Sequence, residues 1–128
     1  MKLNIDCVRD ILLVVEANEF GNQLTLDSLH AQIPQYTLDE VEYACLKLDE
    51  AGMLDVMSIN TLGRTSPAVA RINELTYEGH EFLDNIRAED SWQKLSRAVK
   101  QGGSASLKAI ATVALELGTS ALKARLGL

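Results

Sequence analysis

The sequence has few of the residues and runs that define specialised classes of protein. It holds only 2 cysteines, 2 prolines and 1 tryptophan among 128 residues. Two cysteines exclude a disulfide-stapled scaffold of the kind that small secreted domains use. No apolar run approaches the roughly 18–20 residues of a membrane span, and the first residues lack the pattern of a signal peptide. We therefore expect a cytoplasmic protein.

The sequence also lacks the short motifs that carry most enzyme and cofactor chemistry. It contains no glycine-rich phosphate loop, no nucleophile elbow, and no metal-ligand spacing of the Cys-x2-Cys or His-x3-His type. His30 and His80 have no sequence partner, and we interpret His80 as a histidine at the edge of a buried helix face. We expect no catalytic residue, cofactor or metal, so an enzyme of unknown type is the last of three hypotheses.

What the sequence does have is the composition of a globular domain with an uneven distribution of charge. Hydrophobic residues make up 47% and charged residues 23%, which is typical of a soluble domain. The formal charge of −6 comes from 12 basic and 18 acidic residues. Residues 1–63 contain 3 basic and 11 acidic residues, whereas residues 91–128 contain 6 and 1. The pattern indicates an acidic body followed by a basic, apolar tail.

The first third of the chain is predicted to be mainly helical. Apolar residues at helical spacing predict a helix over residues 4–18, with Asn4 as its N-cap. Residues 23–26 alternate between polar and apolar side chains, as in a short strand. Asp27 or Ser28 is then expected to cap a brief second helix.

The strongest helix signal begins at Thr37. Thr37 and Glu40 have the spacing of a capping box, and Gly52 is expected to end the helix. Its predicted core stripe consists of Leu38, Val41, Cys45 and Leu48. Cys45 and Cys7, on the first helix, are therefore expected to be buried, reduced thiols.

A hairpin and further helices are predicted next. Residues 53–61 and 68–75 read as two strands, and the polar loop 62–67 joins them. The second strand is expected to alternate, with Val69, Arg71, Asn73 and Leu75 on one face and Ala70, Ile72 and Glu74 on the other.

Three helical segments are expected to complete the chain. Thr76 is predicted to cap a helix that buries Phe82, and a short helix containing Trp92 follows it. Residues 101–104 are predicted to break the chain before a last helix over residues 104–126.

This order of elements is that of a winged helix-turn-helix. We predict an α+β, mainly helical fold with a winged helix-turn-helix core, a β-hairpin wing and a C-terminal helical extension. Residues 1–88 are assigned to the winged-helix-like domain, residues 89–101 to a short helical connector, and residues 102–128 to a C-terminal amphipathic helix.

The helix at the position of a recognition helix has the wrong charge for DNA. Acidic side chains would face a polyanion, whereas base readout normally depends on Arg, Lys, Asn and Gln. Our first hypothesis is therefore that this face binds a protein, such as a host or defence factor that it would inhibit. The possible partner-binding residues are Asp39, Glu40, Tyr43, Lys47 and Glu50. The second hypothesis is a DNA-binding accessory in transcription or replication that uses the basic tail and a wing contact through Arg64.

The last helix has an apolar arc that is broader than packing on one domain needs. Small residues recur along the arc and would let a second helix come close. We expect a homo-oligomer, with a dimer favoured, and do not expect membrane binding because the polar strip is poor in Lys and Arg and lacks an aromatic anchor. The possible interface residues are Leu107, Ile110, Ala111, Ala114, Leu117, Gly118, Ala121 and Leu122.

Two segments resemble signatures of an uncharacterised family. The first has the form D-x-x-R-D-I-L-L and consists here of Asp6, Arg9, Asp10, Ile11, Leu12 and Leu13. The second consists of Leu75, Thr76, Tyr77, Glu78, Gly79, His80, Glu81, Phe82 and Leu83, and Trp92, residues 104–107 and residues 126–128 continue the match. The chain is similar over nearly its whole length to a domain of unknown function found in bacteria and prophages. The resemblance implies a winged-helix-like fold and a phage or prophage setting, and it implies no activity.

Overall fold

The computed structural model describes residues 1–102 and 106–128, which form two compact units. The first unit is Met1–Gly79 and the second is His80–Leu128. The predicted α+β, mainly helical fold is confirmed. The predicted division of the chain into domains at residues 88 and 101 stays a prediction.

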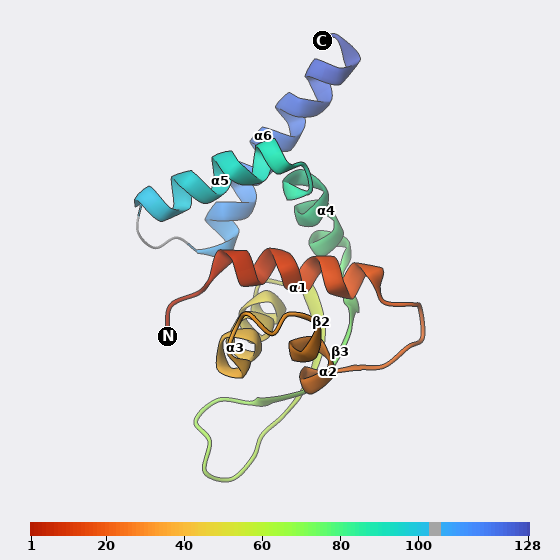
Figure 1. The fold of residues 1–128 in the computed structure, drawn as a ribbon, viewed down its shortest axis with the longest axis vertical. Helices are drawn as coiled ribbons and strands as arrows, with labels where there is room; N and C mark the ends of the chain where they lie inside the picture. The colour runs from red at the N-terminus through yellow and green to blue at the C-terminus, as the bar shows by residue number, and fades with distance from the viewer. Residues whose placement is uncertain (103–105) are drawn as a thin grey trace. The chain divides into compact units, whose positions relative to one another are not determined.

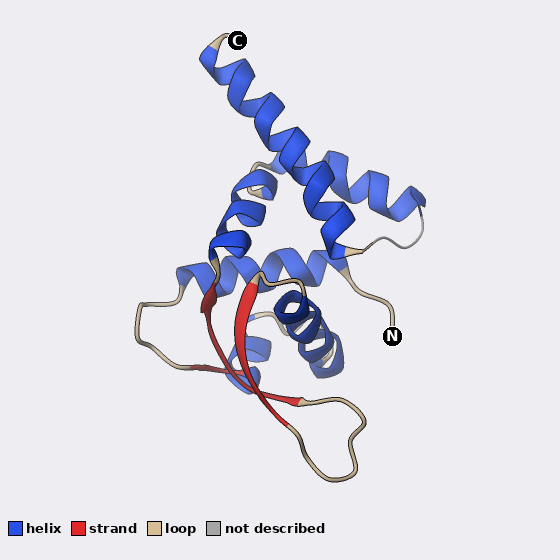
Figure 2. Cartoon of the chain, turned by 180° about the vertical axis from the view of Figure 1, so that it is seen from behind, coloured by secondary structure: helices blue, strands red, loops and turns tan. Residues whose placement is uncertain are grey.

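The first unit has the element order of the predicted winged helix-turn-helix. Its elements are α1 (Ile5–Ala17), β1 (Leu24–Thr25), α2 (Leu26–Gln32), α3 (Leu38–Glu50), β2 (Leu54–Ile59) and β3 (Ala68–Leu75). In Figure 1, α1 lies across α2 and α3, and the sheet lies beside them. Figure 2 shows the loop between β2 and β3 extending well past the paired strands, as expected of a wing.

Side-chain caps fix the starts of the helices in the first unit. The Asn4 side chain accepts hydrogen bonds from the backbone N–H groups of Asp6 and Cys7, as predicted. The capping box of α3 is also confirmed. The Glu40 N–H donates to Thr37 Oγ1 at 3.1 Å, and the Thr37 N–H donates to Glu40 Oε1 at 3.0 Å.

The cap of α2 differs from the prediction. Thr25, rather than Asp27 or Ser28, is the N-cap, because its Oγ1 accepts the Ser28 N–H at 3.1 Å. The Thr25 N–H donates in return to Ser28 Oγ at 2.9 Å. Thr25 ends β1, so one residue terminates a strand and starts a helix.

Helices α1 and α3 supply much of the core of the first unit. Cys7 and Cys45 are both buried, which confirms the prediction. Leu38 is a correction, because it is 39% exposed and Ala44 is buried in the stripe of α3 instead. A helix stripe that is centred on Val41 and Leu48 leaves Leu38 on its border.

The sheet has the order β1–β3–β2, and both pairs are antiparallel. The expected strict alternation of β3 is wrong. Its buried residues are Val69, Ile72 and Leu75, at every third position. The register against β2 shifts twice, so β3 contains extra residues that turn its side chains to the other face.

The second unit is helical. It contains most of α4 (Tyr77–Ile86), together with α5 (Glu89–Gly102) and α6 (Leu107–Leu126). The predicted break at 101 is wrong, because α5 runs through Gly102, and the predicted helix start at 104 lies outside the described residues. Ser106 caps α6, and α6 crosses α5 and continues beyond it (Figures 1 and 2). His80 is exposed on α4, which corrects its expected place at a buried edge.

A close backbone approach joins the end of α3 to the start of α4. The predicted cap Thr76 is confirmed, since its Oγ1 accepts the Gly79 N–H at 3.1 Å and donates to the Gly52 carbonyl at 2.6 Å. The Thr76 N–H donates to the Met53 carbonyl at 3.2 Å. A Cβ at Gly79 would collide with that same carbonyl oxygen. Only glycine lets the helix start so close to the strand.

Candidate functional site

The outer face of α3, at the position of a recognition helix, is the first candidate. Asp39 and Glu50 are exposed, and the other predicted partner-binding residues, Glu40, Tyr43 and Lys47, are half-buried. The chain between residues 37 and 67 contains six acidic and two basic residues. The face is therefore acidic, and its two cations are Lys47 and Arg64.

Glu40 serves the fold of the first unit. Its Oε1 accepts the Thr37 N–H, and its Oε2 accepts Asn4 Nδ2 at 3.2 Å. These two bonds hold the pKa of the Glu40 carboxyl below its ordinary value, and the bond from the Thr37 backbone has the larger effect. Glu40 ties the start of α3 to the start of α1.

The cation of α3, Lys47, is neutralised along its own helix. Its Nζ donates to Glu50 Oε2 at 3.1 Å and lies 5.3 Å from the centre of the Tyr43 ring. The hydrogen bond with Glu50 raises the pKa of Lys47 above its ordinary value. These three residues, predicted as partner-binding, therefore form one cluster.

The predicted wing contact, Arg64, is held against α3. Its Nη2 donates to Glu42 Oε1 at 2.8 Å and to the Pro67 carbonyl at 3.3 Å. The second carboxylate oxygen of Glu42 accepts the Val69 N–H at 3.0 Å. One carboxylate therefore binds both the arginine of the wing and the start of β3. Sequence reasoning missed this role of Glu42, because the residues it joins are 22 and 27 positions away.

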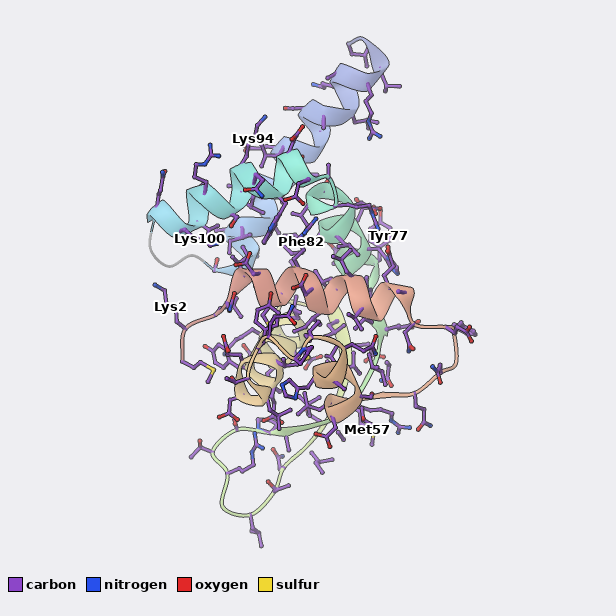
Figure 3. All side chains as sticks on the ribbon, in the orientation of Figure 1. Lys2, Met57, Tyr77, Phe82, Lys94 and Lys100 are labelled. Carbon is purple, nitrogen blue, oxygen red and sulfur yellow. The ribbon has the colours of Figure 1, made fainter. Side chains whose placement is uncertain are left out.

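Apolar side chains are also exposed on β2 and in the wing loop. Met57 and Ile59, on β2, are 45% and 48% exposed, and Leu62, in the wing loop, is fully exposed. Figure 3 labels Met57, whose sulfur accepts a hydrogen bond from Arg71. Leu38 lies one turn before Glu42 on the same face of α3. We call these residues and the acidic face of α3 the α3–wing surface: Leu38, Asp39, Glu42, Asp49, Glu50, Met57, Ile59 and Leu62.

The first signature segment supplies a partly buried polar network in the first unit. The Tyr36 hydroxyl donates to Asp10 Oδ2 at 2.7 Å, and Gln35 Nε2 donates to the same oxygen at 3.4 Å. His30 Nε2 lies 2.8 Å from the Tyr36 carbonyl oxygen. Burial, followed by the bond to Asp10, raises the pKa of Tyr36. Asp10 thus anchors the turn between α2 and α3, and this role is structural.

The two cysteines are free thiols. Burial raises the pKa of Cys7 and of Cys45 to about 12, with the carboxylate of Glu40 adding to the effect at Cys7. The Cys7 thiol lies 4.0 Å from the Glu40 carbonyl. Both remain protonated near neutral pH, which is typical of structural thiols.

The residues of the predicted oligomer interface on α6 are buried to different degrees. Leu107, Ile110 and Ala114 are buried, and Leu122 is 49% exposed. Half-buried positions make up the rest: Ala111, Leu117, Gly118 and Ala121. The part of the interface that self-association could use is therefore narrower than predicted.

Gly118 has a role within the second unit. A Cβ at this position would collide with the side chain of Asn85 on α4. Gly118 therefore allows α4 and α6 of the same chain to come close. The sequence had instead predicted that this small residue lets a helix of a second chain come close.

A metal cluster and a membrane-spanning helix are both absent from the described residues. Within residues 1–102 and 106–128, no group of three or more His, Cys, Asp or Glu side chains is placed to hold a metal ion. None of the helices in the described part of the chain is long and apolar enough to cross a membrane.

Comparison with known proteins identifies relatives of the chain. Residues 2–105 match a family described as "Hypothetical protein (DUF2513)". An uncharacterized protein of Haemophilus influenzae is 34% identical over 116 residues, which cover 89% of this chain and 92% of the relative. No solved structure matches the chain.

Proposed function

The chain belongs to the DUF2513 family, and from its α3–wing surface we propose that it acts by binding a basic protein surface. The observation that carries the proposal is the ion pair between Arg64 and Glu42. A winged helix that binds DNA presents cations to phosphates, whereas this pair neutralises the arginine of the wing.

Charge favours a basic partner. Lys47 is paired with Glu50 and Arg64 with Glu42, while Asp39 and Asp49 lie exposed. The net field of the surface is therefore negative. Such a field attracts a positively charged partner and repels a polyanion.

The apolar residues favour a protein over a small cation. Leu62 is fully exposed and Met57 and Ile59 are about half exposed, so a partner would remove apolar area from water. A basic segment with an apolar anchor complements both features. In the phage or prophage setting that the resemblance implies, a host protein is the partner we propose.

Titration with labelled probes tests the proposal. The full-length protein is titrated into a fluorescein-labelled peptide of lysine and leucine and into mixed-sequence duplex DNA. We expect binding of the lysine peptide and no binding of the DNA. DNA binding that weakens steeply between about 50 and 200 mM salt would overturn the proposal, because that is the signature of phosphate contacts.

Paired variants locate the binding surface. Asp39→Asn with Asp49→Asn should weaken binding of the lysine peptide about tenfold, or 1.4 kcal/mol. The control is Glu19→Gln with Asp27→Asn, which removes two exposed acids outside α3. Equal losses in the two double variants would mean that net charge alone attracts the peptide, and would contradict the proposed site.

The apolar part of the surface is tested separately. Leu62→Ser should weaken binding about fivefold, whereas Phe20→Ser, at another fully exposed apolar residue, should change it less than about twofold. Unchanged binding by Leu62→Ser would remove the wing from the proposal.

Self-association through α6 is a second candidate. Leu115, Leu122 and Leu126 lie on one stripe of the helix and are 54%, 49% and 63% exposed. We expect a dimer by analytical ultracentrifugation that Leu122→Glu converts to a monomer. Ser120→Glu, exposed on another face of α6, should leave the mass unchanged. A monomeric wild-type protein would exclude this candidate.

A further inference from the structure

The second unit has an apolar groove between α5 and α6. The groove has a volume of about 160 Å³. It is lined by Leu95, Ala98 and Val99 of α5 and by Ala109, Ile110 and Val113 of α6. An apolar cavity of roughly 150 Å³ holds a benzene molecule, so the groove has room for one bulky apolar side chain.

The groove is open to solvent and has a fixed floor. Leu95 and Ile110 are 1% and 4% exposed, so the floor belongs to the core of the second unit. Val113, on the wall, is 42% exposed, and Ala98 and Ala109 add little bulk to the rim. Exposed apolar walls over a packed floor are the arrangement that an amphipathic helix fits.

The charge of this region is opposite to that of the α3–wing surface. Residues 89–128, which include α5 and α6, contain six basic residues and three acidic residues, Glu89, Asp90 and Glu116. Lys94 and Arg97 are exposed on α5, and Figure 3 shows Lys94 pointing away from the helix. Lys94 lies one helical turn before Ala98, which lines the groove, so it borders the groove. The excess of cations favours an anionic occupant.

The aromatic content separates a protein occupant from a lipid surface. Trp92 is the one aromatic residue in residues 91–128, and it is 6% exposed. Segments that lie in a membrane interface usually present exposed Trp or Phe side chains, which α5 and the described part of α6 do not. A concave groove with a basic surround fits a helix better than it fits a bilayer.

We propose that the groove between α5 and α6 binds an acidic amphipathic helix of a partner protein, with one bulky apolar side chain of that helix seated against Val99 and Val113. The partner's acidic face lies toward Lys94. The proposal does not depend on the α3–wing surface, which takes a partner of opposite charge. A protein with both surfaces can bring a basic and an acidic partner together.

Designed helical peptides test the charge preference. The probe carries leucines at helical spacing on one face and glutamates on the other, and its counterpart carries lysines instead of glutamates. Both peptides are titrated with the full-length Asp39→Asn, Asp49→Asn variant, in which the α3–wing surface should bind the lysine peptide only weakly, and the glutamate peptide should bind about tenfold more tightly than the lysine peptide. Equal affinities, or a preference for the lysine peptide, would overturn the proposal.

Matched variants test the groove itself. Ala98→Glu adds a charge to the groove wall, and the control Ala124→Glu adds the same charge at an exposed position of α6 that does not line the groove. We expect about tenfold weaker binding of the glutamate peptide by Ala98→Glu and less than a twofold change by Ala124→Glu. Ala109→Trp fills the groove without a charge and should also weaken binding. Similar effects of both glutamate variants would mean that net charge alone attracts the peptide, and would contradict binding in the groove.

Two further arms identify a different occupant. Vesicles of phosphatidylglycerol that bind the protein, while the glutamate peptide does not, would replace the helix by a lipid surface. A wild-type dimer that Ala98→Glu dissociates would assign the groove to a second copy of the chain. The lysine peptide serves as the internal control, because its binding to the α3–wing surface should be the same in Ala98→Glu and wild type.

Discussion

The two units are stabilised in different ways. Met1–Gly79 contains 13 acidic and 5 basic residues, and polar side chains such as Asp10, Glu40 and Glu42 each join two elements of this unit. His80–Leu128 contains 5 acidic and 7 basic residues, and its described helices meet mainly through leucine, isoleucine and alanine. Directional hydrogen bonds fix the geometry of the first unit, whereas non-directional apolar contacts leave a groove in the second.

The difference explains where the two proposed surfaces occur. In the first unit, carboxylates that are bound to backbone and arginine hold the wing, so the remaining acids and apolar residues form a fixed surface. In the second unit, small residues bring helices together and leave space beside Ala98 and Ala109.

At neutral pH, the largest effect is expected at Gly79, where the neighbouring atom is backbone. A Cβ there would collide with the Met53 carbonyl, which cannot move without shifting a strand. Overpacking costs about 3 kcal/mol, and alanine regains about 1 kcal/mol of helix propensity, so Gly79→Ala should lower the free energy of unfolding by about 2 kcal/mol. Urea unfolding measures it, and Glu81→Ala, on the exposed side of α4, should change it by less than about 0.5 kcal/mol.

Alkaline pH should destabilise the first unit selectively. The folded-state pKa of Cys7 and of Cys45 is raised from 9.0 to about 12, so their contribution is full below pH 9 and is lost as the pH rises from 9 to 12. The slope is at most about 1.4 kcal/mol per pH unit for each thiol. The second unit contains no cysteine or tyrosine.

Hydrogen exchange resolved by segment is the measurement for this pH dependence. Amides of α1 and α3 should lose protection, relative to the intrinsic rate, at lower pH than those of α5. Equal loss of protection in both units would show that they unfold as one, and would contradict a selective destabilisation of the first unit.

Gly118 is the counterpart of Gly79 in the second unit, and its neighbour is a side chain. A Cβ there would collide with Asn85, whose side chain can turn away. Gly118→Ala should therefore cost no more than about 1 kcal/mol. In an Asn85→Ala background the same change should become stabilising by up to about 1 kcal/mol, since only the gain in helix propensity remains. A cost that persists in that background would show that Asn85 is not the obstacle.

The smallest effect is expected at the wing. Glu42→Gln removes the charge that pairs with Arg64, but ion pairs at the surface contribute only about 0–1 kcal/mol, and Arg64 of this pair is 39% exposed. The free energy of unfolding should change little, while amide exchange at Val69 should rise, because a neutral amide is a weaker acceptor than a carboxylate. Asp49→Asn, on the same helix, should leave exchange at Val69 unchanged.

Local signals were predicted well from the sequence. The caps Asn4, Thr37 and Thr76 act on backbone groups two or three residues away, so the bonds they make are encoded in adjacent residues. The order of helices and strands, and the burial of Cys7 and Cys45, follow from apolar spacing for the same reason.

The sheet register and the wing needed the tertiary structure. The expected alternation of β3 failed because two register shifts against β2 place Val69 and Ile72 on the same buried face. The sequence of β3 alone does not show where its register against β2 will shift. The pairing of Arg64 with Glu42 likewise depends on where the hairpin returns to α3.

By itself, the sequence determined the class of fold, the helix starts and the division between acidic and basic halves, because each depends on composition or on neighbours within a helical turn. The tertiary structure decided which charges are neutralised, why Gly79 and Gly118 are small, and where a groove opens. These features arise where segments distant in the sequence meet, and the geometry of such a meeting is set by the packing of the whole unit.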